Sequence, residues 1–246
     1  MLSTRRLLPQ ENQRGQSLCI IPARGGSKRI PRKNIKPFCG KPMISWSIEV
    51  ARRSGCFDHI IVSTDDEEIA EISLHSGAAV PFKRPLELAD DYATTRHVVN
   101  HAITEAKQLY GSIGAVCCLY ATAPFVTVED LRKGMLLLSE ESVDFVFTSA
   151  TFAHPVQRAF RQTKTGGLER IQPEHRSTRS QDLEETFHDA GQFYWGSPDA
   201  FLLEKDTISE KSRALVLPRF RVHDIDTEED WLRAEVMFTA LHQHRV

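Results

Sequence analysis

The 246-residue sequence has no excess of charge of either sign. It carries 31 lysines and arginines against 33 acids, so the formal net charge is −2. A near-neutral chain offers no global attraction to nucleic acid or to an anionic membrane. This disfavours a non-enzymatic nucleic-acid module built on the basic residues at 28–36. We expect the protein to act through a local binding site.

Cysteine pairs and long apolar runs are also missing. The five cysteines are odd in number, two of them are adjacent at 117 and 118, and none forms a C-x-x-C pair, so neither a disulfide framework nor a structural zinc site is predicted. No window approaches the roughly 20 apolar residues that span a bilayer. The N-terminus lacks the apolar core of a secretory signal. The sequence therefore predicts a cytoplasmic protein without membrane contact, with a mobile leader over residues 1–16.

Apolar residues make up 41 % of the chain, enough for a core. Short apolar runs alternate with amphipathic segments, a pattern typical of an α/β fold. Strands are expected at 18–21, 59–63, 115–120 (central in the sheet), 144–150, 192–195 and 214–217. Helices are expected from Lys41-Pro42, after 64–68, from Thr94 or Thr95, from Thr127, over 197–203 and over 227–241. One domain over 17–246 is predicted, with a polar, arginine-rich insertion lobe at about 152–190.

The first predicted strand ends directly in a glycine pair surrounded by cations. The segment 20–34 reads IIPARGGSKRIPRKN. Glycines let backbone amides approach an anion closely, and the cations can neutralise a polyphosphate. The segment matches neither the Walker A loop nor the G-x-G-x-x-G motif. Its position at the carboxyl end of a strand, where α/β folds place ligands, favours a phosphate site over a basic surface loop.

A second motif lies near the C-terminus, where residues 223–230 read HDIDTEED. In an extended segment, residues two apart face the same side, so Asp224 and Asp226 would present paired carboxylates. Such a pair suits Mg²⁺, which takes one or two carboxylates plus substrate phosphates. Thr227 and Asp230 also make an approximate capping box, so some of these acids can serve only the helix N-terminus. Both interpretations stay open on this segment alone.

Another pair, His97 and His101, has the i, i+4 spacing of a zinc site but lacks the accompanying glutamate, so a metal is not expected there.

Together these motifs resemble those of cytidylyltransferases that activate nine-carbon sialic-acid-like sugars. ARGGSKRIPRKN at 23–34 is similar to that family's opening signature, VSTDDEEIA at 62–70 to its second strand and helix, and DIDT at 224–227 to its metal motif. The resemblance extends over nearly everything from Leu18 to Met237. It implies a Rossmann-like fold of the nucleotide-diphospho-sugar transferase type, with a mixed, mostly parallel sheet flanked by helices.

The resemblance also implies roles for single residues. Arg24 and Lys33 match the arginine and lysine that hold the nucleotide phosphates, and with Asp226 they are the expected catalytic residues. Mg²⁺ is expected on Asp224 and Asp226. The other nucleotide contacts are expected at Ala23, Gly25, Ser27, Lys28, Asn34, Arg84, Asp91 and Thr94.

Some stretches are similar to the pseudaminic acid branch of this family, namely 178–196 and VPFKRP at 80–85. LYATAPF at 119–125 places Tyr120 where the sialic acid enzymes have glutamine, which argues against N-acetylneuraminate as substrate. Arg179 is the expected partner of the sugar carboxylate, because a guanidinium matches a carboxylate bidentately. Further sugar contacts are expected at Tyr120, His188 and Gln192.

The implied reaction joins CMP from CTP to the anomeric hydroxyl of pseudaminic acid, a nine-carbon 2-keto sugar acid, with release of pyrophosphate. The product would be a donor for glycosylation of flagellin or other surface structures, and a homodimer through the insertion lobe is implied. Synthesis of CMP-N-acylneuraminate or CMP-legionaminate remains an alternative. So does a nucleotide-sugar-dependent glycosyltransferase, whose acid-x-acid motif normally ends a mid-chain strand.

Overall fold

The structure is a computed structural model that describes residues 15–90 and 92–243. Its centre is a six-stranded sheet in the order β10-β6-β9-β5-β1-β4. Neighbouring strands pair in parallel except at β9, which is antiparallel to both β5 and β6. The expected mixed, mostly parallel sheet is confirmed. Its strands are β1 (Gln16–Pro22), β4 (His59–Ser63), β5 (Ile113–Leu119), β6 (Phe145–Thr151), β9 (Phe187–Gly196) and β10 (Ser212–Val216).

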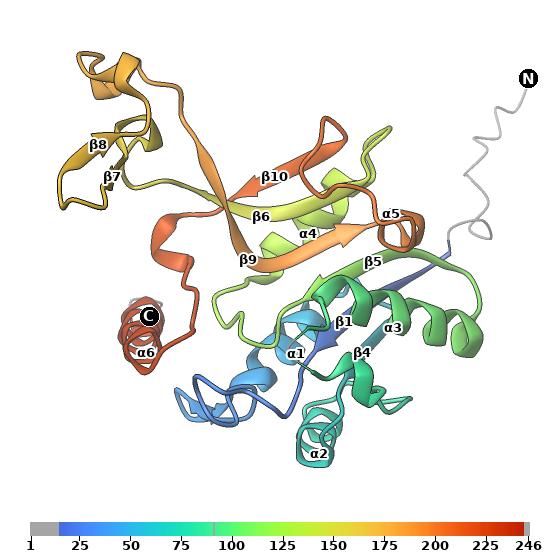
Figure 1. Cartoon of the computed structure of the whole chain (residues 1–246). Helices are drawn as coiled ribbons and strands as arrows, with labels where there is room; N and C mark the ends of the chain where they lie inside the picture. The colour runs from blue at the N-terminus through green and yellow to red at the C-terminus, as the bar shows by residue number, and fades with distance from the viewer. Residues whose placement is uncertain (1–14, 91, 244–246) are drawn as a thin grey trace, which may run out of the picture.

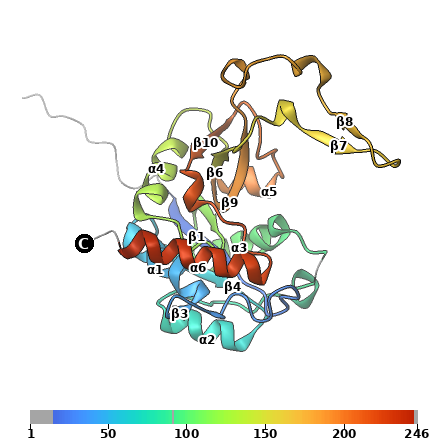
Figure 2. The ribbon, with the colours of Figure 1, turned by 90° about the vertical axis from the view of Figure 1, so that its left-hand side faces the viewer.

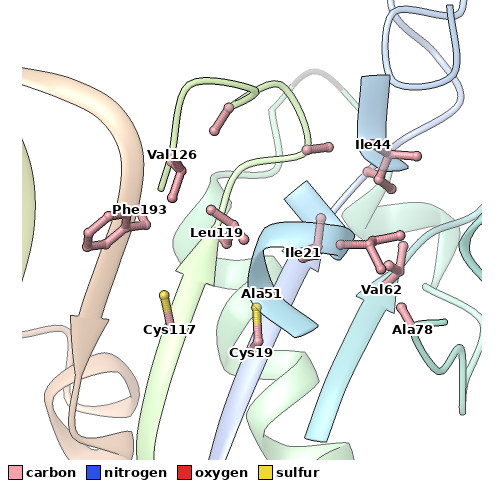
Figure 3. Packing of buried hydrophobic residues seen from close by; sticks show 14 of the residues in the cluster. Cys19, Ile21, Ile44, Ala51, Val62, Ala78, Cys117, Leu119, Val126 and Phe193 are labelled. Atoms are coloured by element: carbon pink, nitrogen blue, oxygen red, sulfur yellow. The ribbon is translucent and has the colours of Figure 1, made fainter. Parts of the chain in front are cut away.

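Helices cover both faces of this sheet (Figure 1). One face carries α3 (Thr95–Tyr110) and α5 (Pro198–Leu202), which pack against Leu18 and Ile20 of β1. The other carries α1 (Met43–Ser54), α2 (Glu67–His75) and α4 (Val128–Leu138), which pack against Cys19 and Ile21 (Figure 3). Because both faces are buried, the strand reads as a continuous apolar run rather than an alternating one.

The last helix, α6 (Glu228–Gln243), lies outside these two layers and crosses near α1 (Figure 2). Its Trp231 and Phe238 pack edge-to-face against Phe38, which is fully buried. Ile225, just before the helix, is buried in the same cluster. This packing holds the segment that carries Asp224 and Asp226 against the loop that follows β1.

The region between β6 and β9 projects from the sheet as a separate arm (Figures 1 and 2). It contains the antiparallel pair β7 (Phe160–Gln162) and β8 (Leu168–Arg170). Short 3-10 turns lie along it at 156–158, 173–175 and 180–182. Strand β9 begins at Phe187, five residues before the strand expected from the sequence.

The first residues of α3 and α1 can be compared with the helix starts expected from the sequence. Thr94, rather than Thr95, caps α3 by accepting a hydrogen bond from the His97 amide. The prediction that a helix begins at Lys41-Pro42 was wrong: α1 begins at Met43. Residues Lys41–Pro42 (β3) instead pair with Pro37–Phe38 (β2) across a turn at Cys39 and Gly40, both with positive φ. Among the described residues, no helix combines the length and apolarity needed to cross a membrane.

Candidate active site

A polar cavity of about 320 Å³ opens at the carboxyl edge of the sheet, where β1, β4 and β5 end. Its walls come from the loop after β1, from the segment between β4 and α3, and from the residues that follow β5. Since α/β sheets place ligands at this edge, the location matches the sequence-based expectation. The sequence-predicted residues that line it are Arg24, Ser27, Lys28, Lys33, Asn34, Arg84 and Tyr120.

The loop after β1 is held in shape by contacts within the protein. Asn34 is buried, and its side-chain amide donates to the Arg24 carbonyl at 2.9 Å. Gly25 lies so close to Asp66 that a Cβ there would stand 2.6 Å from the Asp66 carboxylate, which explains the glycine. Its amide donates to Asp65 at 3.1 Å, so this amide serves the loop rather than a phosphate. Asn34 and Gly25 thereby fix the loop that carries the cations.

Cations dominate the cavity wall. Arg24, Lys28, Arg29 and Lys33 all line it. Arg24 donates to the Asp90 carbonyl at 2.8 Å. Several positive side chains converging on one polar cavity provide the electrostatic complement of a polyphosphate.

Arg84 adds a buried positive charge to the same wall. It is only 4 % exposed, and its guanidinium donates to the Ser63 hydroxyl at 3.1 Å and to the Ser63 carbonyl. Burial, with a further contribution from nearby Arg24, lowers the pKa of Arg84 to about 10, although Asp65 opposes the shift. A buried guanidinium that faces a cavity favours an anionic ligand.

Asp224 and Asp226 do not line this cavity, but Asp226 contacts two cations of its wall. Lys33 donates to the Ile225 carbonyl at 2.8 Å and to Asp226 at 3.3 Å, and Arg29 pairs with Asp226 at 2.7 Å. Partial desolvation and the like charge of the neighbouring Asp226 raise the pKa of Asp224, although this residue is exposed to solvent. Asp230, in contrast, belongs to the helix start: it accepts from the amide and hydroxyl of Thr227.

This donor set fits Mg²⁺. Two carboxylates that repel each other supply hard oxygen ligands, and Mg²⁺ commonly takes one or two of these together with substrate phosphates. The described residues include no group of three or more His, Cys, Asp or Glu side chains that could hold a metal. His101 packs edge-on against Phe82, with ring centroids 5.3 Å apart.

A second cavity of about 310 Å³ shares Thr95 and Tyr120 with the first. Tyr120 donates to the Thr95 hydroxyl at 3.3 Å and packs edge-to-face with Tyr194 at 5.9 Å. The Tyr194 hydroxyl donates to the Asp189 carboxylate. Burial raises the pKa of Tyr120 to about 12, so its hydroxyl stays protonated. The remaining walls come from Arg96, Val99, Cys118, Phe145, Phe201, Asp206, Thr207 and Ile208.

The other predicted residues lie outside the two cavities. Thr94 caps α3, and Ala23 donates its amide to the Ser63 carbonyl at 3.0 Å. His188 packs against Phe152 at the base of the arm, and Arg179 is exposed farther along it. Gln192 is buried, and its amide donates to the Arg221 carbonyl at 2.6 Å. Asp91 lies outside the described residues. The contacts predicted for all of these residues stay predictions.

Sequence reasoning did not assign several residues that line the first cavity. Arg29 was part of the quoted loop, and its pairing with Asp226 could not be seen without the fold. Thr95, Thr122 and Asp90 also contribute to the wall. Asp90 and Thr95 are sequence neighbours of the expected contacts at Asp91 and Thr94, and Thr122 lies in the stretch 119–125.

Comparisons with known proteins identify the family to which the chain belongs. The sequence model of the family described as "Cytidylyltransferase" matches residues 18–221. The chain belongs to the cytidylyltransferase family. It is therefore a nucleotidyltransferase, as the resemblance predicted.

Among its relatives is the pseudaminic acid cytidylyltransferase of Campylobacter jejuni, 44 % identical over 93 % of this chain and 98 % of that protein. The CMP-N,N'-diacetyllegionaminic acid synthase of Legionella pneumophila is 31 % identical over 89 % of this chain and 94 % of that protein. A solved CMP:2-keto-3-deoxy-manno-octonic acid synthetase in complex with CTP has a TM-score of 0.67. It is 14 % identical, covers 92 % of this chain and 99 % of its own, and supports the fold alone.

Proposed function

We propose that the protein transfers CMP from CTP to the anomeric hydroxyl of pseudaminic acid, giving CMP-pseudaminic acid and pyrophosphate. The observation that carries this proposal is a cation-lined cavity at the ligand-binding edge of the sheet, two of whose lining cations, Arg29 and Lys33, pair with Asp226. The choice of sugar is supported by the 44 % identity to a pseudaminic acid enzyme, against 31 % to the legionaminic acid enzyme.

In this reaction the anomeric hydroxyl attacks the α-phosphorus in line with the departing pyrophosphate. Such chemistry depends mainly on positioning and on the neutralisation of charge. Arg24, Lys28 and Arg84 hold the triphosphate, while Lys33 and Arg29 neutralise charge beside the carboxylates. A carboxylate oxygen of Asp224 or Asp226 accepts the proton of the attacking hydroxyl.

Mg²⁺ is the proposed cofactor, with Asp224 and Asp226 as its protein ligands. When bound, it would supply a positive charge that offsets the phosphate oxygens. The protein's own part is to hold the two carboxylates in register, through the Lys33 bonds to Asp226 and to the Ile225 carbonyl.

We assign the sugar acid to the second cavity, because Tyr120 forms a wall of both cavities. A sugar placed there would have its anomeric centre beside the nucleotide and its polar substituents toward the Tyr194–Asp189 pair. Asp189 can accept hydrogen bonds from hydroxyl or acylamino groups.

A homodimer through the arm is part of the proposal. The arm exposes Phe160, Leu168 and Ile171, which are 57–69 % accessible, and such apolar groups commonly mark an interface. Arg179 lines neither cavity of its own chain. It would meet a sugar carboxylate only if the arm reaches the site of a second copy.

The proposal places the reaction in the cytoplasm, where CTP is available, and its product as a donor for flagellin or other surface glycans. The experiment is incubation with CTP, Mg²⁺ and pseudaminic acid, followed by pyrophosphate detection and product mass. A CMP-sugar and equimolar pyrophosphate are expected. Glycosyl transfer from a supplied sugar nucleotide, with no pyrophosphate from CTP, would instead identify a glycosyltransferase.

A further inference from the structure

Gln192 lines neither cavity but is bonded to Tyr120, which lines both. It is 3 % exposed on β9. Its backbone carbonyl accepts the Tyr120 amide at 3.0 Å, and its side-chain amide donates to the Arg221 carbonyl at 2.6 Å. One residue thus contacts both the tyrosine shared by the cavities and the segment that leads into Asp224.

Arg221 begins that segment, residues 221–227, which we call the carboxylate segment. Its guanidinium forms two hydrogen bonds to the Asp130 carboxylate, at 2.5 and 3.1 Å. The pair is largely buried, with side-chain exposures of 18 % and 7 %. Asp130 is fixed in turn, because it completes the capping box of α4 with Thr127. The first end of the carboxylate segment is therefore attached to a rigid helix start.

The far end of the carboxylate segment is attached as well. Thr227 and Asp230 cap α6 with reciprocal bonds, and the Asp226 amide donates to Asp230 at 3.3 Å. Between the two ends, Asp224 is exposed and no regular secondary structure holds it. The segment is also held at Ile225, whose side chain is buried and whose carbonyl accepts from Lys33 at 2.8 Å. Asp224 lies between this point and Arg221, so the Gln192 bond contributes to its position relative to Tyr120.

We propose that Gln192 is a positioning residue, an inference that rests on the proposed function. Through its bond to the Arg221 carbonyl, Gln192 sets the distance between Tyr120 and the carboxylate pair that would bind Mg²⁺. This role differs from the direct sugar contact expected from the sequence. A direct contact would need the amide to face a cavity, whereas Gln192 lines neither cavity and one of its N–H groups is bonded to the Arg221 carbonyl. Without the Gln192 donor, the Arg221 side chain would still be bonded to Asp130, but the Arg221 end of the carboxylate segment could shift relative to Tyr120.

The test compares Gln192→Leu with a matched control, Gln157→Leu. Gln157 is also buried and also donates its amide to a backbone carbonyl, that of Glu184 at 2.9 Å, but it lies on the arm. Two quantities are measured: the Mg²⁺ concentration that gives half-maximal turnover, and the CTP affinity by calorimetry with and without Mg²⁺. The second does not depend on turnover.

For Gln192→Leu we expect the half-saturating Mg²⁺ concentration to rise about five- to tenfold, the scale of one lost buried hydrogen bond. The gain in CTP affinity caused by Mg²⁺ should shrink by the same factor, while metal-free CTP affinity and the KM for the sugar acid stay unchanged. Gln157→Leu should leave the Mg²⁺ response unchanged. If Gln192→Leu does not fold, Gln192→Met replaces it, because methionine has nearly the length of glutamine but no N–H to donate to the Arg221 carbonyl.

A raised sugar KM with a normal Mg²⁺ response would overturn the inference and restore the direct sugar contact. An unchanged variant would overturn the inference alone, since the wild-type enzyme would still make the CMP-sugar. A wild-type protein with no Mg²⁺ response at all would overturn both the metal site and the positioning role.

Discussion

Replacing Arg84 by methionine should separate ligand binding from stability. The guanidinium is buried in the wall of the first cavity and bonds to the hydroxyl and carbonyl of Ser63. Methionine keeps much of the side-chain volume but removes the charge and both bonds. The stability of the fold gains from removal of a buried charge and loses from removal of the two bonds to Ser63, so these changes oppose each other. The affinity for an anionic ligand, in contrast, can only fall.

The magnitudes follow from this environment. A pKa lowered to about 10 means that burial of the charge costs about 3 kcal/mol at neutral pH, where folded and unfolded forms are both protonated. Loss of the two bonds to Ser63 costs roughly 1–3 kcal/mol, and the Ser63 carbonyl keeps the Ala23 amide as a partner. The free energy of unfolding should therefore stay the same or rise by up to about 2 kcal/mol. CTP should lose a charged contact of about 1.5–3 kcal/mol, a roughly 10- to 150-fold rise in Kd.

The assay combines urea unfolding with calorimetric titration of CTP. Arg132→Met is the control, because Arg132 also donates to a serine carbonyl, that of Ser54 at 2.8 Å, but lies at the opposite edge of the sheet. It should change CTP affinity by less than about twofold, since the charge is remote and screened. An Arg84→Met protein that binds CTP normally, or that loses several kcal/mol of stability, would refute the reasoning.

Three further predictions concern the carboxylates and the arm. Asp226→Asn keeps the side-chain shape but not the charge that pairs with Lys33, so turnover should fall about 100-fold with an unchanged unfolding midpoint; full turnover would contradict the role. Hydrogen bonds from the Ser17 amide and then its hydroxyl lower the pKa of Asp58. The stabilisation from this carboxylate is thus present above the unfolded pKa of about 4 and lost as pH falls through the folded pKa. Unfolding of Asp58→Asn should depend less on pH in that range than unfolding of the wild type; identical curves would contradict this. Arg179→Ala and Asp226→Asn should each have low activity alone, and mixed subunits should regain activity if the arm serves a second copy; no recovery after subunit exchange would exclude that arrangement.

Local sequence signals were sufficient for most of the elements. The apolar run at 115–120 predicted a central strand, and β5 does lie between β1 and β9. The helix expected from Thr127 does begin there, and Thr127 caps it in a capping box with Asp130. These features depend on residues close together in the chain, so the periodicity of apolar residues and the chemistry of helix capping predict them.

Long-range contacts were not accessible in the same way. The Asp130–Arg221 pair joins residues 91 apart, and the bond from Gln192 to Arg221 could not be distinguished from a sugar contact by residue type. The second cavity combines side chains from α3, β5, β6, β9 and α5 with residues 206–208, so no single sequence motif predicts it. Only the packed sheet decides which polar residues face a cavity and which hold another segment.

The most direct test of the central claim is a comparison of kcat/KM for four acids with CTP and Mg²⁺: pseudaminic, legionaminic, N-acetylneuraminic and 3-deoxy-manno-octulosonic acid. Pyrophosphate release reports the rate, and product mass identifies the CMP-sugar. We predict that pseudaminic acid has the highest kcat/KM. A higher value for another acid would contradict the assigned sugar, and no CMP-sugar from any of the four would contradict the proposed reaction.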